Sequence, residues 1–244
     1  GIHESDYLMS PVEAALENWQ LNVDVFPPEL DPSLVWLETI NEPDKNRAQW
    51  LAEFSLAQAK MAVAAGYKYA AFGWSSGEPE LEQWELPQML EFLRYAGEHP
   101  DNIAIALHEY SFETDFIGSG DLPYPWGVGR FQKLFAICDK HNISRPTVLI
   151  TEWGWEYDEV PEPDEAMKDI EWASWLYAAY PQVKGAAIWY LGEGDQFGSI
   201  HERAQKLIAP VHDYGMTNYF VIYPGQFPID ESLFVPNPPT AYRE

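Results

Sequence analysis

The stretch Thr147-Val148-Leu149-Ile150-Thr151 decides the fold class, because it is short, apolar at its centre and followed at once by Glu152. A run that is apolar on both alternating faces is typical of a parallel strand covered on either side. Four similar runs, each followed by a stretch with helical spacing, occupy residues 35–40, 69–74, 103–107 and 185–190. The five runs start 34, 34, 44 and 38 residues apart, close to the length of one strand, one helix and their loops. The sequence therefore predicts a repeating βα unit.

The stretches between these runs predict the helices of the same units. Apolar residues recur with helical spacing over residues 46–65, 87–96, 129–141, 164–180 and 203–212. Gly66 directly follows the first stretch, and glycine suits the left-handed position just past the end of a helix. We therefore predict an α/β fold with a parallel sheet.

Polar residues at the ends of the predicted strands distinguish the two common arrangements of βα units. An open doubly wound sheet and a closed (β/α)8 barrel both produce this repeat. No glycine-rich phosphate loop follows any strand, whereas polar or aromatic residues end five successive strands, Asn41-Glu42 and His108-Glu109-Tyr110 among them. Functional residues drawn from the ends of many strands are typical of the barrel. The sequence therefore favours a (β/α)8 TIM barrel.

The chain offers fewer strands than such a barrel needs. Five strands are clear from residue 35 onward, and residues 1–5 and 11–19 are interpreted as the end of an earlier strand and its helix. We therefore expect the first strands to be missing from this chain or shortened. The predicted domains are a barrel catalytic domain over residues 1–217 and a tail over residues 218–244. This tail holds five of the 20 prolines and is expected to pack on the barrel.

Composition excludes several classes of protein. With 14 Lys and Arg against 39 Asp and Glu, the net charge of −25 disfavours nucleic acid and anionic membrane surfaces as partners. The single cysteine, Cys138, excludes an intrachain disulfide and any multi-cysteine metal site. Neither a membrane span nor a signal peptide is visible. The 11 Trp, 14 Tyr and 12 Phe suit either a core of large residues or a site for sugar rings.

Two carboxylates stand out by their position. Glu42 and Glu152 each end a predicted strand, and strand alternation places each on the face of the apolar residue two positions before it. Both side chains are therefore expected to point into one barrel mouth. A pair of carboxylates there suits glycoside hydrolysis, in which one protonates the departing oxygen and the other attacks the anomeric carbon or activates water.

Four motifs in register resemble those of the clan A glycoside hydrolases, over roughly residues 34–192. Asn41-Glu42-Pro43 resembles their fourth-strand acid/base motif, and Thr151-Glu152-Trp153-Gly154 resembles their seventh-strand nucleophile motif. Between them, His108-Glu109-Tyr110 is similar to the sixth-strand His-x-Tyr of the cellulase-like families, and Ile188-Trp189-Tyr190 is similar to the eighth-strand tryptophan motif.

The resemblance implies a retaining mechanism with two catalytic residues. Glu42 would be the general acid/base, with a pKa high enough to hold a proton before cleavage, and Glu152 would be the nucleophile. Their carboxyl groups would then lie about 5–5.5 Å apart. Tyr110 would hold Glu152 in its ionised geometry, and His108 would contact substrate or orient a carboxylate.

The resemblance also implies a set of substrate contacts. Asn41 would bind the sugar 2-hydroxyl, and Trp189 would form the floor under the sugar at the cleavage point. Trp74, which ends the second predicted strand, is expected either to stack on sugar or to pack a loop. Glu78 is a further candidate for contact with substrate hydroxyls, as are Glu193 and Asp195. Catalysis of this type needs no cofactor, and the six scattered histidines suggest no metal site.

One element of the family pattern has no match, which keeps other functions open. Clan A enzymes place an arginine near the second or third strand, whereas the first arginine here is Arg47. A carbohydrate-binding barrel without catalysis is therefore one alternative, and a transglycosidase with the same carboxylates is another. The leading prediction is a monomeric retaining glycosidase that acts on β-linked carbohydrate in an extracellular or periplasmic location. The sequence does not identify the sugar or the linkage.

Overall fold

The computed structural model describes residues 7–112, 116–156, 159–190 and 198–219. It contains strands β1 (Trp36–Glu38), β2 (Lys68–Trp74), β3 (Ile103–Tyr110), β4 (Thr147–Gly154) and β5 (Val183–Ile188). These strands form one sheet in the order β1-β2-β3-β4-β5, and β1 pairs with β2, and β2 with β3, in parallel. Every strand therefore neighbours in space the strand that precedes or follows it in the chain. The predicted α/β fold with a parallel sheet is confirmed.

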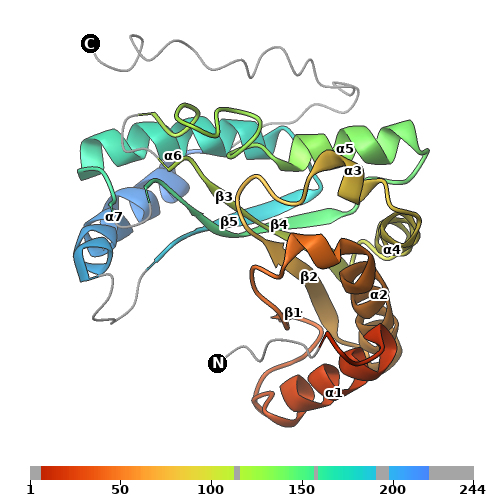
Figure 1. The fold of residues 1–244 in the computed structure, drawn as a ribbon. Coiled ribbons are helices and arrows are strands. Elements are labelled where there is room, and N and C mark those ends of the chain that lie inside the picture. The colour runs from red at the N-terminus through yellow and green to blue at the C-terminus, as the bar shows by residue number, and fades with distance from the viewer. Residues whose placement is uncertain (1–6, 113–115, 157–158, 191–197, 220–244) are drawn as a thin grey trace. The chain divides into compact units, whose positions relative to one another are not determined.

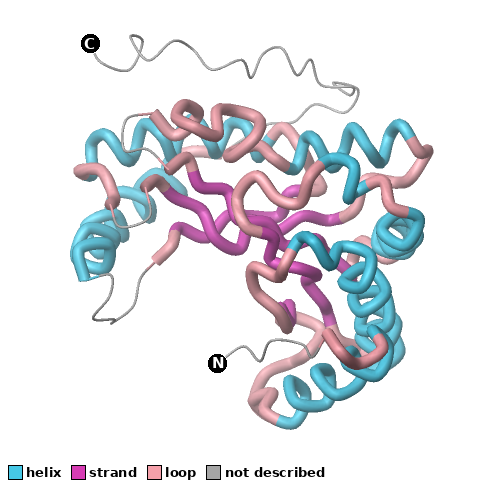
Figure 2. The backbone as a smooth tube through the Cα atoms, viewed as in Figure 1, coloured by secondary structure: helices cyan, strands magenta, loops and turns pink. Residues whose placement is uncertain are grey.

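Helices separate the strands along the chain, as Figure 2 shows by colour. The predicted helix over residues 46–65 is a 3₁₀ turn, η1 (Lys45–Arg47), followed by α2, and Gly66 ends α2 with the predicted left-handed conformation at φ 77°. The helices are α1 (Pro11–Asp24), α2 (Ala48–Ala65), α3 (Leu81–Trp84), α4 (Pro87–Glu98), α5 (Phe131–Lys140), α6 (Pro163–Ala178) and α7 (Gly198–Thr217).

Two of the expected segments fall largely outside the described residues. The expected strand end over residues 1–5 lies outside them, and so does the expected tail apart from Asn218 and Tyr219. Asn218 still continues from α7, because its backbone N–H donates to the carbonyl oxygen of Tyr214 at 2.9 Å. In the part of the chain that the structure describes, no helix is both long and apolar enough to cross a membrane.

The chain divides into two compact units. The first comprises Gly1–His108 and Phe131–Thr151, and the second comprises Glu109–Arg130 and Glu152–Glu244. In the first unit α2 packs against β2, α1 and α4 (Figure 1). All residues of β2 except Lys68 are buried. This strand therefore has the covered, apolar character that its sequence predicts.

A buried polar chain in the first unit joins the helices to the residues just before Glu42. Thr39 Oγ1 donates to Gln58 Oε1 at 2.6 Å, and Gln58 Nε2 donates to Asn18 Oδ1 at 2.7 Å. All three side chains are buried, so each hydrogen bond satisfies a polar group that would otherwise be costly to bury. The chain of bonds ties α1 and α2 to the segment that ends at Glu42.

A bulge at the end of β2 shapes the backbone beside Glu42. The register between β2 and β3 shifts at Phe72 and Trp74, and Gly73 between them has a φ of 57°. A Cβ atom at Gly73 would meet Glu38 Oε1, and the positive φ also favours glycine at this position. Glu38 in turn accepts a hydrogen bond from Thr151 Oγ1 at 3.2 Å.

In the second unit, α6 packs against β5 and α7. The loop between β3 and α5 packs on α6 through Phe116 and Tyr124, whose rings contact Trp172 edge to face. Asp169 of α6 joins two loops, because it accepts hydrogen bonds from the backbone of Ile117 at 3.2 Å and from the indole of Trp155 at 2.6 Å. Burial raises the pKa of Asp169 to about 6.

Candidate functional site

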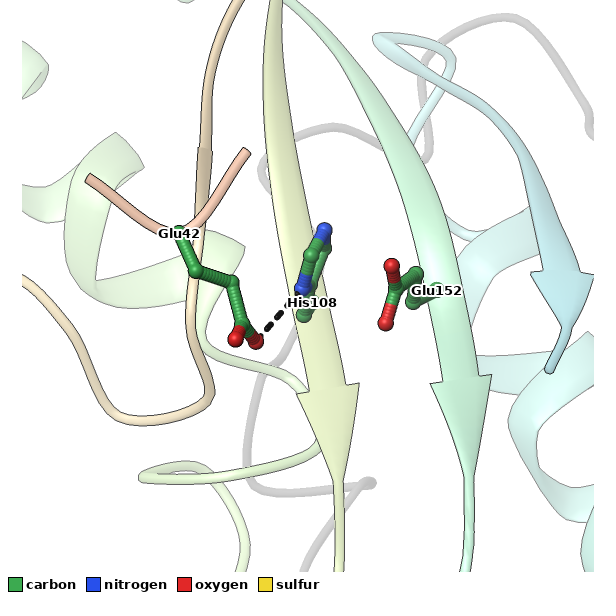
Figure 3. A group of neighbouring side chains, drawn as sticks. All are labelled: Glu42, His108 and Glu152. Carbon is green, nitrogen blue, oxygen red and sulfur yellow. Dashed lines mark hydrogen bonds and ion pairs between the residues drawn. The ribbon is translucent and has the colours of Figure 1, made fainter. Parts of the chain in front are cut away.

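The first group of predicted site residues surrounds Glu42, which follows β1. Its backbone N–H donates to the carbonyl oxygen of Gly73 at 2.9 Å, and its φ of 44° is unusual for a residue with a side chain. Its side chain is 45% exposed, and its Oε1 lies 3.0 Å from Nδ1 of the buried His108 (Figure 3). The strained backbone therefore coincides with a carboxylate that is open to solvent on one side and bound to imidazole on the other.

The hydrogen bond with His108 sets the protonation of Glu42. It lowers the pKa of the Glu42 carboxyl and outweighs burial, which acts in the opposite direction; a hydrogen bond with Ser75 also lowers it. This shift is opposite in direction to the high pKa that the resemblance implies for an acid/base before cleavage. The physical reason is that a donor aimed at a carboxylate stabilises its ionised form.

His108 is held in place by its own strand and by its neighbour β2. Its side chain is 1% exposed, near the C-terminal end of β3. Its carbonyl oxygen accepts a hydrogen bond from Ser76 Oγ at 3.1 Å. The ring of His108 lies against Glu42, and its role in orienting a carboxylate or contacting substrate stays a prediction.

The second group of predicted site residues surrounds Glu152, near the C-terminal end of β4. The Tyr110 hydroxyl donates to Glu152 Oε2 at 2.8 Å, and both side chains are half-buried. Gly154 lies beside the phenol ring, since a Cβ atom at this glycine would be 3.3 Å from Tyr110 Cε1. The structure therefore brings Tyr110 and Glu152 together as the resemblance implied.

Trp189 belongs to the same group. It directly follows β5, and its backbone N–H donates to the carbonyl oxygen of Trp153 at 2.9 Å. Its half-buried ring meets the Tyr110 ring edge to face, with 6.5 Å between the centroids. Trp189 is therefore positioned by the residue after Glu152 and by the phenol that binds Glu152.

The remaining candidates for substrate contact differ in their accessibility. Asn41 is exposed, and its side chain makes no hydrogen bond with the described residues. Trp74 is fully buried, stacked on Phe72 at 5.0 Å and packed edge to face on Trp84. Of the two roles expected for Trp74, stacking on sugar is contradicted, because its ring is packed in the core.

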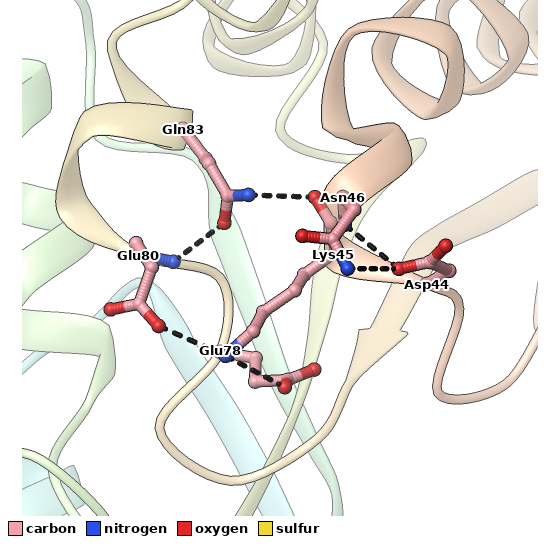
Figure 4. A network of polar contacts seen from close by, with 6 residues as sticks. All are labelled: Asp44, Lys45, Asn46, Glu78, Glu80 and Gln83. Atoms are coloured by element: carbon pink, nitrogen blue, oxygen red, sulfur yellow. Dashed lines mark hydrogen bonds and ion pairs between the residues drawn. The ribbon is translucent and has the colours of Figure 1, made fainter.

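Glu78 is engaged by a lysine, and the other acidic loop candidates are not described. Lys45 Nζ lies 3.1 Å from Glu78 and 2.9 Å from Glu80. These two ion pairs join η1 to the loop after β2 (Figure 4). The side chain of Lys45 is 33% exposed and that of Glu80 is 59% exposed, so solvent screens these ion pairs and they contribute little stability. Glu193 and Asp195 lie outside the described residues.

Sequence reasoning missed two buried carboxylates of the second unit. Strand alternation places Glu109 on the opposite face of its strand from His108 and Tyr110. In the structure it accepts hydrogen bonds from Tyr177 and from the backbone of Gly129. Asp169 was missed altogether. The available signal was the acidic residue itself: a carboxylate within an apolar strand or on the apolar face of a helix needs buried partners.

Comparison with known proteins adds no family to this geometry. No protein-family model matches the chain, and no curated protein matches its sequence.

Proposed function

We propose that this protein is a retaining glycoside hydrolase that cleaves β-linked oligo- or polysaccharide, on a (β/α)8 barrel. The observation that carries the proposal is the hydrogen bond from the Tyr110 hydroxyl to Glu152 Oε2 at 2.8 Å. A nucleophilic carboxylate must be held in the orientation for attack, and a hydrogen bond from a phenol fixes that orientation. Glu152 also lies at the C-terminal end of a parallel strand, where barrel enzymes carry their active sites.

The proposed reaction has two displacements. In the first, an oxygen of Glu152 attacks the anomeric carbon, the glycosidic bond breaks, and Glu42 gives its proton to the departing oxygen. In the second, Glu42 takes a proton from water, the water oxygen attacks the same carbon, and the bond to Glu152 breaks. The two inversions restore the β configuration of the sugar, and Glu42 regains its proton.

The lowered pKa of Glu42 requires a change when substrate binds. The side chain is 45% exposed, so a bound sugar would remove water from it, and desolvation raises the pKa of a carboxyl. His108 Nδ1 can donate to an ionised Glu42 or accept from a protonated one, depending on its tautomer. We propose that the imidazole keeps the hydrogen bond in both states of the carboxyl.

Substrate binding is assigned to exposed and aromatic groups. Asn41, whose amide is exposed, would bind the 2-hydroxyl, and Trp189 would lie under the sugar ring. Tyr110 and His108 are assigned to orient the two carboxylates, through their hydrogen bonds with Glu152 and Glu42. The strand order β1-β2-β3-β4-β5 supports the barrel, in which neighbouring strands also follow in chain order.

The experiment that tests the proposal combines turnover with labelling. The protein is assayed against aryl β-glycosides of several sugars, with and without EDTA because carboxylate and imidazole groups also bind metals. It is then treated with the matching 2-deoxy-2-fluoro glycoside, and its peptides are analysed by mass spectrometry. We expect turnover that EDTA does not change, a β-anomeric first product, and a glycosyl label on Glu152.

Other outcomes identify the alternatives. Sugar binding that persists in Glu42→Ala and Glu152→Ala variants, with no hydrolysis by the parent protein, would indicate a carbohydrate-binding barrel. Transfer products that dominate over hydrolysis at moderate acceptor concentration would indicate a transglycosidase. A label on another residue would remove Glu152 from the nucleophile role.

A further inference from the structure

A buried carboxylate lies directly between His108 and Tyr110 on β3. The side chain of Glu109 is fully buried and, by strand alternation, faces away from those of its two neighbours. Its Oε2 accepts a hydrogen bond from the Tyr177 hydroxyl at 2.7 Å and another from the Gly129 backbone N–H at 2.8 Å. A carboxylate is retained in such surroundings only where donors compensate its lost hydration.

Tyr177 is a permanent donor to this carboxylate. Its side chain is buried in α6, and burial together with the negative charge of Glu109 holds the pKa of Tyr177 well above its ordinary value. The indole N–H of Trp153, which makes no hydrogen bond of ordinary length with the described residues, lies close enough to lower that pKa slightly. Trp153 is the residue after Glu152, so Tyr177 contacts the neighbours of both Tyr110 and Glu152.

Gly129 brings the end of the β3–α5 loop to the same carboxylate. Its φ of 87° is a left-handed conformation that favours glycine, and it turns the backbone N–H toward Glu109. Two residues earlier, a Cβ atom at Gly127 would lie 2.8 Å from the carbonyl oxygen of Tyr110. The loop therefore packs against the backbone of Tyr110 where Glu109 anchors it.

We infer that Glu109 is a positioning residue, whose carboxylate fixes the end of β3 and the loop so that the Tyr110 hydroxyl meets Glu152. It would act from the face of the strand opposite the reacting groups and never touch substrate. This inference rests on the proposed glycosidase function. It adds that the rate of the chemical step depends on a buried group outside the sugar site.

The test replaces Glu109 by glutamine, which keeps its shape and removes its charge. We expect kcat to fall by roughly tenfold to a hundredfold, because a small misplacement of a catalytic group has effects of that size, while KM changes by less than about threefold. Glu171→Gln, an exposed change on the same helix as Tyr177, is the matched control and should leave both constants unchanged. Circular dichroism and melting temperature establish that the variants are folded.

A double-mutant cycle with Tyr110→Phe separates positioning from a general effect on the fold. If Glu109 acts through the Tyr110 hydroxyl, Glu109→Gln should lower kcat by much less in the Tyr110→Phe background than in the parent. An equal loss in both backgrounds would overturn the inference, and so would an unchanged kcat. Should Glu109→Gln fail to fold, Tyr177→Phe removes one donor alone and is expected to give a smaller loss of kcat with the same non-additivity.

The two proposals fail in different ways. A parent protein without turnover or labelling contradicts the glycosidase function itself. An active parent that Glu109→Gln leaves unaltered contradicts only the positioning role.

Discussion

Glu42 and Glu152 differ in the partner that holds each carboxylate. Glu42 meets an imidazole, with Nδ1 of His108 at 3.0 Å, whereas Glu152 accepts from a phenol, with the Tyr110 hydroxyl at 2.8 Å. An imidazole nitrogen can donate or accept a hydrogen bond, but a phenol beside an ionised carboxylate only donates. The first partner therefore suits a carboxyl that gains and loses a proton, and the second suits one that stays ionised.

Glu42 and Glu152 also differ in how the backbone positions them. Glu152 lies within β4, where the ladder of the sheet fixes it. Glu42 follows β1 with a φ of 44°, and its backbone N–H is tied to Gly73 at the bulge of β2. Glu152, the proposed nucleophile, is thus placed by regular structure, whereas Glu42, the proposed acid/base, is placed by a local strain that neighbouring contacts maintain.

The largest expected effect is the loss of Glu152. Glu152→Ala removes the proposed nucleophile, so turnover should fall by roughly 10⁴-fold or more on every substrate. Added azide should restore part of the rate by attacking from the vacated side and should give a glycosyl azide of inverted configuration. Rates are measured by release of the aryl leaving group, and the azide product is identified by NMR. A retained azide would assign the acid/base role to Glu152 instead.

Glu42→Ala should lower the rate of cleavage only for substrates with poor leaving groups. General acid catalysis contributes about 10²- to 10⁴-fold, so substrates with a sugar leaving group should lose activity by that factor. Substrates with a dinitrophenyl leaving group need no proton and should be cleaved in the first step nearly as fast as by the parent. Pre-steady-state bursts on the two substrates measure this difference. Equal losses on both would remove Glu42 from the acid role.

How well the sequence predicts the surroundings of Glu42 and Glu152 depends on how far apart the interacting residues lie along the chain. Strand alternation placed Glu109 on the face opposite Tyr110, and the glycine at position 66 predicted the end of α2. Both inferences use only local periodicity and backbone preference. The donors to Glu109 lie 20 and 68 residues away along the chain, so no local sequence pattern indicates either hydrogen bond.

Local sequence patterns do not indicate the bulge at Gly73 either. The carboxylate of Glu38, which comes from another strand, occupies the space that a Cβ atom at Gly73 would take. The same bulge accompanies the burial of Trp74, which strand alternation alone could not foresee. The lowered pKa of Glu42 also arises from a partner 66 residues away, so the Asn41-Glu42-Pro43 motif does not indicate the direction of that shift.

Tyr110→Phe tests the phenol side of the comparison. It removes one hydrogen bond to a charged group, worth about 1.5–3 kcal/mol, so kcat should fall by roughly tenfold to a hundredfold. KM should change little, because the hydroxyl is assigned to the nucleophile and not to the sugar. Tyr95→Phe, which removes a hydroxyl from α4, is the control and should leave the rate unchanged. A raised KM with unchanged kcat would instead make Tyr110 a substrate-binding residue.

His108→Leu tests the imidazole side through the pH profile. The hydrogen bond from His108 lowers the pKa of Glu42, so its loss should raise that pKa. Because Glu42 must be protonated to act as the acid, the alkaline limb of the kcat/KM profile should move to higher pH. His108→Asn places an amide donor near the position of Nδ1 and should bring the alkaline limb partly back.

An alkaline limb that stays in place in His108→Leu would contradict this role of His108. Because His108 is buried, the melting temperature of each variant must show that it is folded over the pH range of the assay.

The smallest expected effect comes from a single methyl group beside the phenol. A Cβ atom at Gly154 would lie 3.3 Å from Tyr110 Cε1, a little closer than ordinary van der Waals contact, so Gly154→Ala should displace the ring by a few tenths of an ångström. The hydroxyl would then meet Glu152 at a poorer angle, and kcat should fall by about two- to tenfold. In a Tyr110→Phe background the same methyl group has no hydrogen bond to disturb, so the loss should largely disappear. If kcat fell equally in both backgrounds, the glycine would matter for packing in the second unit and not for the contact between the phenol and the nucleophile.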